Sequence, residues 1–288
     1  MYPATFDYYR ARDLQDAVRL LAAHADAKVL AGGHSLLPMM KLRLATPAAV
    51  VDIGRLAELK GISVGGGRVA IGALTTHGEI AASPAVREHC RLLAEVAARI
   101  ADPQVRNRGT IGGNIAHADP ASDMPAAILA LDGVVYLTGP RGERRVEARR
   151  FFVDLLTSDV QPGEVLTRID VGTLGARAGS AYLKFEHPAS GYAVCGAAAV
   201  VTLAADGRCT TARLCFNGVT ATPLDATPVA AALAGSAADD AAIDGAVDGK
   251  LVVEDPLGDI HFSGEYRGML AHVYGKRALK LARDRARA

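Results

Sequence analysis

The order of apolar and polar positions over residues 1–54 predicts a small α/β unit. Asp13 precedes apolar residues at helical spacing, so its carboxylate can cap a helix that begins at Leu14. Short apolar runs with strand character lie on both sides of a second helical segment. The predicted elements are a helix over 14–21, a strand over 28–31, a helix over 36–42 and a strand over 50–53. We expect these elements to form a first lobe.

Predicted strands and helices follow one another at shorter intervals over residues 55–175 and indicate a second lobe that mixes the two. Thr76 and Glu79 have the spacing of a helix capping box. Ser83 followed by Pro84 predicts the start of a long helix that continues to about Ile100. The remaining predictions are a hairpin of strands 62–64 and 68–72, a helix over 124–131, and strands over 134–137 and 165–171.

Three glycines between 172 and 179 mark a boundary, and the pattern beyond it predicts a third lobe over residues 176–288. Its predicted elements are strands over 181–185, 192–203 and 208–216, a helix that opens at Thr227–Pro228, and an amphipathic helix over 265–288. We interpret the charged side of that last helix as a solvated face. An antiparallel sheet packed under helices makes the predicted fold class α+β.

Composition and charge limit the kinds of partner and site that we expect for this chain. Lys and Arg total 32 against 31 Asp and Glu, so a net charge of +1 gives no reason to expect a nucleic-acid partner. The longest uncharged apolar stretch, residues 191–205, is shorter than the ~20 residues that span a bilayer. The four cysteines form no Cys-x-x-Cys pair, and the first residues lack a signal-peptide pattern. We therefore expect buried thiols, no metal site, no membrane span and a cytoplasmic location.

Two glycine-rich segments are the candidate site. The first is Ala31-Gly32-Gly33-His34-Ser35, which follows a predicted strand and precedes a predicted helix. The second is Thr110-Ile111-Gly112-Gly113-Asn114, with Arg106 and Arg108 just before it. Paired glycines let backbone N–H groups approach a pyrophosphate closely, and hydroxyl and amide side chains add donors. The alternative interpretation of either segment alone is an ordinary glycine loop.

The common nucleotide and catalytic motifs are missing. Residues 65–70 formally match G-x-G-x-x-G/A, but the Rossmann motif needs a helix where this sequence predicts a strand, which favours a hairpin. The sequence contains no Walker A motif, no His-Glu-x-x-His, no four-cysteine cluster and no G-x-S-x-G. We expect no catalytic side chain in this chain, and expect the chemistry to belong to a cofactor.

Three segments carry a resemblance to a known family: residues 30–44, 102–114 and 119–125. They resemble the FAD-binding medium subunit of molybdenum hydroxylases, of the aerobic carbon monoxide dehydrogenase and xanthine dehydrogenase type. The resemblance extends over nearly the whole chain, including 162–166 and 184–194. It implies a two-lobed PCMH-type (vanillyl-alcohol-oxidase-like) FAD-binding domain over 1–54 and 55–175, followed by a domain like the CO dehydrogenase flavoprotein C-terminal domain over 176–288.

The resemblance also implies site residues. By resemblance, both glycine segments wrap the FAD pyrophosphate, Asp123 bonds the ribityl or adenosine portion, and Leu166 packs near the dinucleotide. Lys184 and Tyr192 are then expected at the isoalloxazine, where a tyrosine ring can stack on the flavin and limit access of solvent and oxygen. Without the family, a core tyrosine and a surface lysine are equally good interpretations.

The family implies an electron-transfer role for the chain. Its partners would be a molybdopterin-binding large subunit and a small subunit with [2Fe–2S] clusters, in a dimer of heterotrimers, with an external electron acceptor. Two rivals stay open. One is a self-sufficient FAD-dependent oxidase or reductase with its own substrate pocket, in which His34 can tether FAD covalently. The other is a scaffold subunit without flavin. The substrate and the electron acceptor are left open.

Overall fold

The first lobe is a three-stranded parallel sheet with two helices, and the computed structural model describes it together with the rest of residues 1–288. The strand order is β1-β3-β2, with β1 Asp7–Arg10, β2 Ala27–Leu30 and β3 Ala49–Asp52. Helix α1 spans Leu14–Ala23 and helix α2 spans Leu36–Lys41. Asp13 caps α1 as predicted, since its carboxylate accepts the Asp16 N–H at 2.7 Å. The first glycine segment joins β2 to α2.

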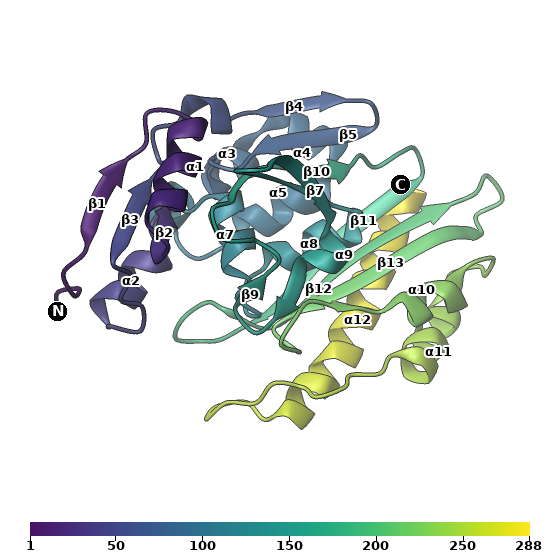
Figure 1. The fold of residues 1–288 in the computed structure, drawn as a ribbon. Helices are drawn as coiled ribbons and strands as arrows, with labels where there is room; N and C mark the ends of the chain where they lie inside the picture. The colour runs from purple at the N-terminus through teal and green to yellow at the C-terminus, as the bar shows by residue number, and fades with distance from the viewer.

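The middle of the chain forms a five-stranded antiparallel sheet, in the order β4-β5-β10-β6-β7, with helices packed against it (Figure 1). The strands are β4 Ile62–Gly65, β5 Arg68–Gly72, β6 Val134–Gly139, β7 Gly142–Glu147 and β10 Val165–Gly172. The helices are α3 His77–Ala82, α4 Pro84–His89, α5 Arg91–Ala98, α6 Pro103–Arg106, α7 Ile111–His117, α8 Met124–Ala130 and α9 Ala148–Phe151, and a small hairpin pairs β8 Phe152–Asp154 with β9 Thr157–Ser158.

Two local predictions in this region have different outcomes. The capping box is present, because Thr76 accepts the Glu79 N–H and the Glu79 carboxylate accepts the Thr76 N–H. The single long helix over 84–100 is wrong, because Cys90 leaves the helical region with φ −153° and ψ 59° and separates α4 from α5. The Cys90 side chain is fully buried, so packing overrides the helical pattern at this residue. Strand β7 and the β8–β9 hairpin were not predicted.

The third sheet is antiparallel, in the order β11-β12-β13-β14, and carries the C-terminal helices. Its strands are β11 Ala178–Glu186, β12 Ala193–Leu203, β13 Cys209–Asn217 and β14 Leu224–Asp225. Helices α10 Thr227–Leu233, α11 Asp240–Lys250 and α12 Gly264–Arg287 follow. Figure 1 shows α12 lying across one face of β11 and β12, with α10 and α11 beside it. The mixture of helices and antiparallel sheets confirms the α+β class.

The hydrophobic cores show how the parts are joined. The core of the middle sheet includes Tyr182, Ala198 and Cys215 from the third sheet, so the third sheet packs one face on α8 and α5 and the other under α12. All four cysteines are buried and free, as predicted. No helix is both long and apolar enough to cross a membrane. The lobe boundaries at residues 54 and 175 stay a prediction.

Candidate functional site

The two glycine segments lie against each other. A Cβ atom on Gly32 would stand only 2.2 Å from the Arg108 carbonyl oxygen, so only glycine permits this approach. Ala31 lies close to Gly113, since a Cβ added there would be 3.8 Å from the Ala31 methyl. The structure therefore brings together two segments that are about eighty positions apart in the sequence, and the first lobe meets the middle lobe at this contact.

The first segment presents unused backbone donors. The N–H groups of Gly32, Gly33, His34 and Ser35 donate no hydrogen bond within the chain. Gly33 has φ +81°, a left-handed conformation that lets successive N–H groups face one side as an anion-binding concavity. The Ser35 hydroxyl makes no capping bond with α2, and the His34 side chain is exposed. This geometry suits a phosphate group.

The second segment differs from the expectation that both segments offer backbone donors. Ile111 N–H donates to the Thr75 carbonyl at 3.1 Å, and Gly112 N–H donates to the Ala73 carbonyl at 2.9 Å. Gly113 N–H donates to the Thr110 hydroxyl oxygen, which caps α7. The N–H groups of Ile111, Gly112 and Gly113 are therefore already satisfied, and the donors of this segment left for a ligand are the N–H and hydroxyl groups of Thr110 and the Asn114 side-chain NH₂.

The glycines of this second segment serve close packing. A Cβ on Gly112 would stand 2.5 Å from the Ala73 methyl, so α7 rests directly on the chain that leaves β5. Arg106, expected to offer charge, donates instead to the carbonyls of Ile100 and Ala101 at 2.9 and 2.7 Å. The second segment is thus a support against which the first segment packs.

Asp123, Tyr182 and Lys184 form a buried polar cluster between the middle and third sheets. The Tyr182 hydroxyl donates to one carboxylate oxygen of Asp123 at 2.5 Å, and the Lys184 ammonium donates to the other at 2.9 Å. Lys184 also donates to the Arg99 carbonyl at 3.3 Å. Burial raises the pKa of the Asp123 carboxyl, and the Lys184 charge opposes that rise. Burial, with Asp123 adding to it, also raises the pKa of Tyr182.

This cluster decides between the two interpretations of Lys184 that the sequence left open. Lys184 is buried with an ionic partner, so the surface-lysine interpretation is wrong. The cluster also joins α8 to β11, because Asp123 immediately precedes α8. Whether Asp123 and Lys184 contact the cofactor stays a prediction.

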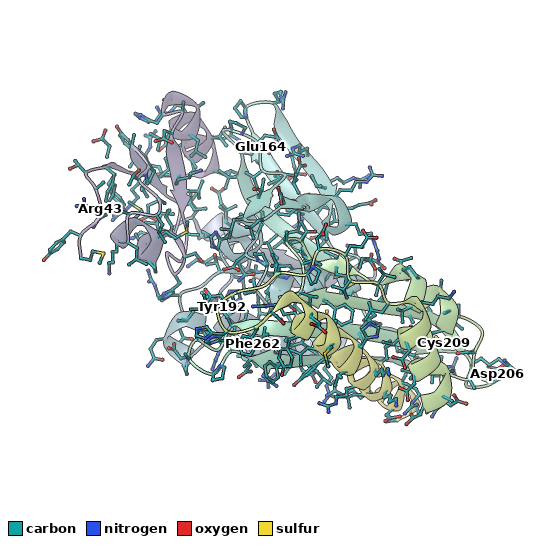
Figure 2. The ribbon with its side chains drawn as sticks, turned by 90° about the horizontal axis from the view of Figure 1, so that it is seen from below. Arg43, Glu164, Tyr192, Asp206, Cys209 and Phe262 are labelled. Atoms are coloured by element: carbon teal, nitrogen blue, oxygen red, sulfur yellow. The ribbon has the colours of Figure 1, made fainter.

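Tyr192 lies at the end of the β11–β12 hairpin, beside the segment 119–123. Ala193 N–H donates to the Ala121 carbonyl at 3.3 Å, and Ser122 in that segment donates to Asn114 of the second glycine segment at 2.7 Å. The Tyr192 side chain is 49% exposed, and Figure 2 shows it at the edge of the third lobe. Partial burial, followed by the carboxylates of Asp119 and Asp123, raises its pKa. Hydrogen bonds thus link the second glycine segment to Tyr192.

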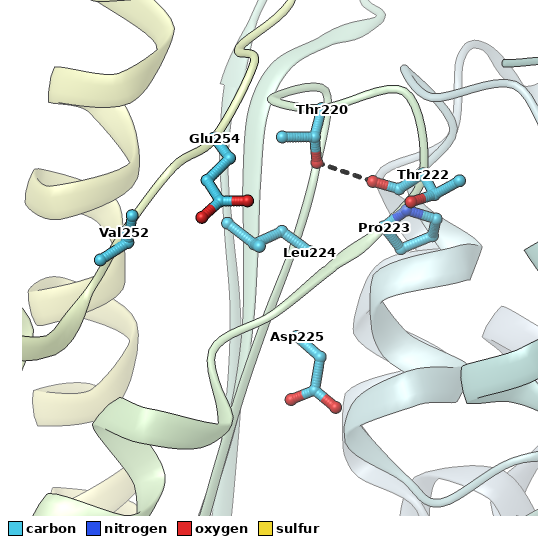
Figure 3. Close-up of a pocket in the computed structure, with 7 residues that line it drawn as sticks. All are labelled: Thr220, Thr222, Pro223, Leu224, Asp225, Val252 and Glu254. Atoms are coloured by element: carbon cyan, nitrogen blue, oxygen red, sulfur yellow. Dashed lines mark hydrogen bonds between the residues drawn. The ribbon is translucent and has the colours of Figure 1, made fainter. Parts of the chain in front are cut away.

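Leu166 and one of the two cavities lie apart from the residues that link the second glycine segment to Tyr192. Leu166 is buried in the core between β10 and β6, at a register shift in their pairing. A cavity of about 230 Å³ borders the 119–123 segment and is lined by Asp119, Leu155, Leu156 and Arg267 among others. A second cavity of about 300 Å³ lies on the third lobe between Thr220 and Glu254 and contains none of the predicted site residues (Figure 3).

Known proteins match this chain over its whole length. Residues 4–173 match the family model of the FAD binding domain in molybdopterin dehydrogenase, and residues 180–282 match that of the CO dehydrogenase flavoprotein C-terminal domain. The chain belongs to this family of FAD-binding subunits. It is 40% identical to the carbon monoxide dehydrogenase medium chain of Afipia carboxidovorans, covering 100% of both chains.

Two further relatives support the assignment of this FAD-binding subunit. The chain is 37% identical to subunit alpha of the 6-hydroxypseudooxynicotine dehydrogenase complex of Paenarthrobacter nicotinovorans, covering 100% of this chain and 97% of that one. A solved structure of carbon monoxide dehydrogenase from Hydrogenophaga pseudoflava matches with a TM-score of 0.95 at 41% identity, over 99% of each chain. The FAD cofactor and the two-part fold implied by the resemblance are therefore confirmed.

The residues present fit FAD. The first segment has four consecutive N–H groups that donate no hydrogen bond within the chain, and a dinucleotide pyrophosphate needs such donors. The Ser35 hydroxyl, the Thr110 hydroxyl and the Asn114 amide lie at or beside the contact between the two segments and can add neutral donors. No bulky side chain replaces either glycine pair. These residues would hold the pyrophosphate of FAD.

Sequence reasoning missed Tyr182, Ser122 and Asn217. The Tyr182 hydroxyl lies 3.2 Å from the Asn217 side-chain oxygen as well as contacting Asp123. A signal for Tyr182 was present, because alternate residues of a strand share a face and Tyr182 and Lys184 are two positions apart in the predicted strand. Ser122 lies within a quoted segment, but a lone serine gives no sign of a partner eight positions away.

Proposed function

We propose that this FAD-binding subunit is the electron-transfer subunit of a molybdenum hydroxylase. It would pass electrons from [2Fe–2S] clusters of a partner subunit to an external acceptor. The observation that carries the proposal is the row of free N–H groups at 32–35, packed on the second glycine segment, in a chain of this family. The named relatives are medium chains or complex subunits of dehydrogenases, which supports a role within a larger assembly.

Each part of the site has a proposed task. The N–H groups of Gly32 to Ser35 bind the pyrophosphate, and Ser35, Thr110 and Asn114 add side-chain donors. The Asp123–Lys184 pair fixes the boundary of the middle and third sheets, on which the hairpin that ends in Tyr192 is built. Tyr192 covers the flavin and limits access of water and oxygen. Bound FAD supplies the redox chemistry that these side chains lack.

The partners follow from the same proposal. We expect a molybdopterin-binding large subunit and a small [2Fe–2S] subunit, in a dimer of heterotrimers. Substrate would be oxidised in the large subunit. Two relatives of similar identity to this chain, carbon monoxide dehydrogenase and 6-hydroxypseudooxynicotine dehydrogenase, are named for different substrates. The similarity therefore does not identify the substrate of the assembly. Four buried free thiols favour a reducing, cytoplasmic location for the assembly.

Two measurements test the proposal. The purified chain should show flavin absorbance bands or acquire them on addition of FAD, and a chain that never binds flavin would support the scaffold rival. Affinity purification from the native source should bring down an iron–sulfur protein and a molybdopterin protein. If neither copurifies, or if the isolated holo-chain oxidises an organic substrate at full rate, the electron-transfer role is wrong and a self-sufficient oxidase takes its place.

A further inference from the structure

The Asn114 side chain has two faces of opposite character. Its amide carries a carbonyl oxygen, which only accepts hydrogen bonds, and an NH₂ group, which only donates them. A pyrophosphate offers acceptor oxygens alone, so only the NH₂ face can bind it, and an amide turned by half a revolution would place acceptor against acceptor. The direction in which the Asn114 amide points therefore decides whether this residue can bind the pyrophosphate.

The Ser122 hydroxyl fixes that direction. Its oxygen lies 2.7 Å from the Asn114 Oδ1 atom, which is the usual O–H···O distance, whereas N–H···O bonds are usually about 2.9 to 3.0 Å long. Since Oδ1 carries no proton, the hydroxyl is the donor. Ser122 is only 6% exposed, so water has little access to its hydroxyl. The carbonyl face of the amide is thus held toward Ser122, and the NH₂ face is left for a ligand.

The backbone that carries Ser122 is itself held in place. Ser122 N–H donates to the Asp119 carbonyl at 3.0 Å, which closes the turn. The third lobe holds the same turn, because Gly218 N–H donates to the Pro120 carbonyl at 2.6 Å. The residue after Ser122 is Asp123 of the buried polar cluster. The position of the Ser122 hydroxyl is therefore set before any ligand binds, which lowers the cost of ordering the amide on binding.

We propose that Ser122 is a positioning residue of the flavin site and orients the Asn114 amide so that its NH₂ group faces the FAD pyrophosphate. Ser122 does not bind the pyrophosphate itself, because its one hydroxyl proton is donated to Asn114 and a pyrophosphate offers no proton in return. The inference rests on the proposed task of Asn114 in the proposed function. It also gives the third lobe a part in binding the pyrophosphate, since that lobe holds the turn at Pro120.

Replacement of Ser122 by alanine tests the orientation. The Asn114 carbonyl oxygen would lose its partner, and the amide would be free to turn. Binding of FAD should weaken by about 5-fold or more, which is the cost of leaving a desolvated acceptor unpaired. The assay is titration of the flavin-free full chain with FAD, followed by flavin fluorescence. Ser180→Ala is the matched control and should bind FAD like wild type, because Ser180 is also buried, at 2% exposed, but its hydroxyl has no hydrogen-bond partner.

A double-mutant cycle separates positioning from direct contact. If Ser122 acts only through Asn114, adding Ser122→Ala to an Asn114→Ala chain should change FAD affinity by less than about 2-fold. A second loss as large as that in the wild-type chain would show that Ser122 binds FAD directly, and the proposal would be wrong. Ser122→Thr keeps the hydroxyl and should recover most of the affinity that Ser122→Ala loses. Binding by Ser122→Thr as weak as by Ser122→Ala would also overturn the proposal.

Substitution of Asn114 itself tests the direction of the amide. The carboxylate in Asn114→Asp still accepts from Ser122 but turns a charged oxygen toward the pyrophosphate, so this variant should bind FAD at least about 10-fold more weakly than Asn114→Ala. Equal binding by the two variants would contradict the proposed orientation. Wild-type affinity in Asn114→Ala would remove the task of Asn114 and this inference with it, but not the electron-transfer role. A wild-type chain that never takes up FAD would contradict the proposed function itself.

Discussion

Replacement of Gly32 by alanine tests the contact between the glycine segments most directly. The added methyl would stand 2.2 Å from the Arg108 carbonyl oxygen and 3.0 Å from the Gly109 Cα atom, both in the backbone. Since ordinary contacts are above 3 Å, the two segments must separate by on the order of 1 Å. The first segment would then lose its support against α7, and its free N–H groups would move away from the Thr110 and Asn114 donors.

The expected loss follows from that strain. Overpacking of this kind costs about 1 to 3 kcal/mol, which corresponds to about 5-fold to 150-fold weaker binding of FAD if the strain falls on the bound state. The assay is titration of the flavin-free chain with FAD, followed by quenching of flavin fluorescence, with circular dichroism to check folding. Gly65→Ala is the control, because a Cβ on Gly65 meets nothing within 4 Å. FAD affinity of Gly32→Ala equal to that of Gly65→Ala would refute the argument.

Three further outcomes are expected. Lys184→Met should lower the free energy of unfolding by about 3 to 5 kcal/mol at pH 8, measured by urea unfolding, because it leaves the buried Asp123 carboxylate without its ionic partner. The loss should be smaller at pH 5, because the raised pKa of Asp123 lets that carboxyl take up a proton as pH falls. Adding Asp123→Asn to the Lys184→Met chain should restore stability. Burial lowers the pKa of His77 to about 4, so between pH 6.5 and 4 the unfolded chain binds a proton that the folded chain does not. The free energy of unfolding should therefore fall by about 3 kcal/mol as the pH drops through that window. His77→Gln should remove this contribution to the pH dependence of stability. Acid precipitation should release the flavin into the supernatant, and yellow protein in the pellet would show instead a covalent bond to His34.

Local signals in the sequence were enough for helices α1 and α3 with their caps and for strands such as β5, β10 and β12, but not for β7 or the β8–β9 hairpin. Asp13 and the pair Thr76 and Glu79 satisfy N–H groups within four residues of themselves, so their sequence spacing already contains the geometry. Cys90 shows the limit, because the helical pattern continues through a residue whose buried position breaks the helix. Such a break is decided by packing against distant elements, which a single sequence does not display.

At the candidate site, the close approach of the glycine segments was predictable from the sequence, but the contacts that they make were not. Glycine pairs announce close approach of backbone, yet only the fold shows that the Gly112 N–H is used by Ala73 while the Gly32 N–H is left free. The alternation of Tyr182 and Lys184 predicts a shared strand face, whereas their common partner Asp123 is 59 and 61 positions away. Which donors remain for a ligand therefore depends on tertiary pairing, and chemistry read from residue types alone overcounts them.

The first glycine segment has free backbone donors and the second mainly supports it, and this difference bears on how FAD would be bound. A three-stranded sheet with two helices buries enough surface for only marginal stability alone, and the core of the first lobe includes Leu74 and Val165 of the middle lobe. The N–H groups proposed to bind the pyrophosphate lie on the first lobe, while the segment that they pack against lies on the middle lobe. A ligand that touches both lobes must bind the docked arrangement more tightly than the undocked one. If FAD is held by both glycine segments as proposed, we expect FAD binding and docking of the first lobe to stabilise each other through the contact at Gly32.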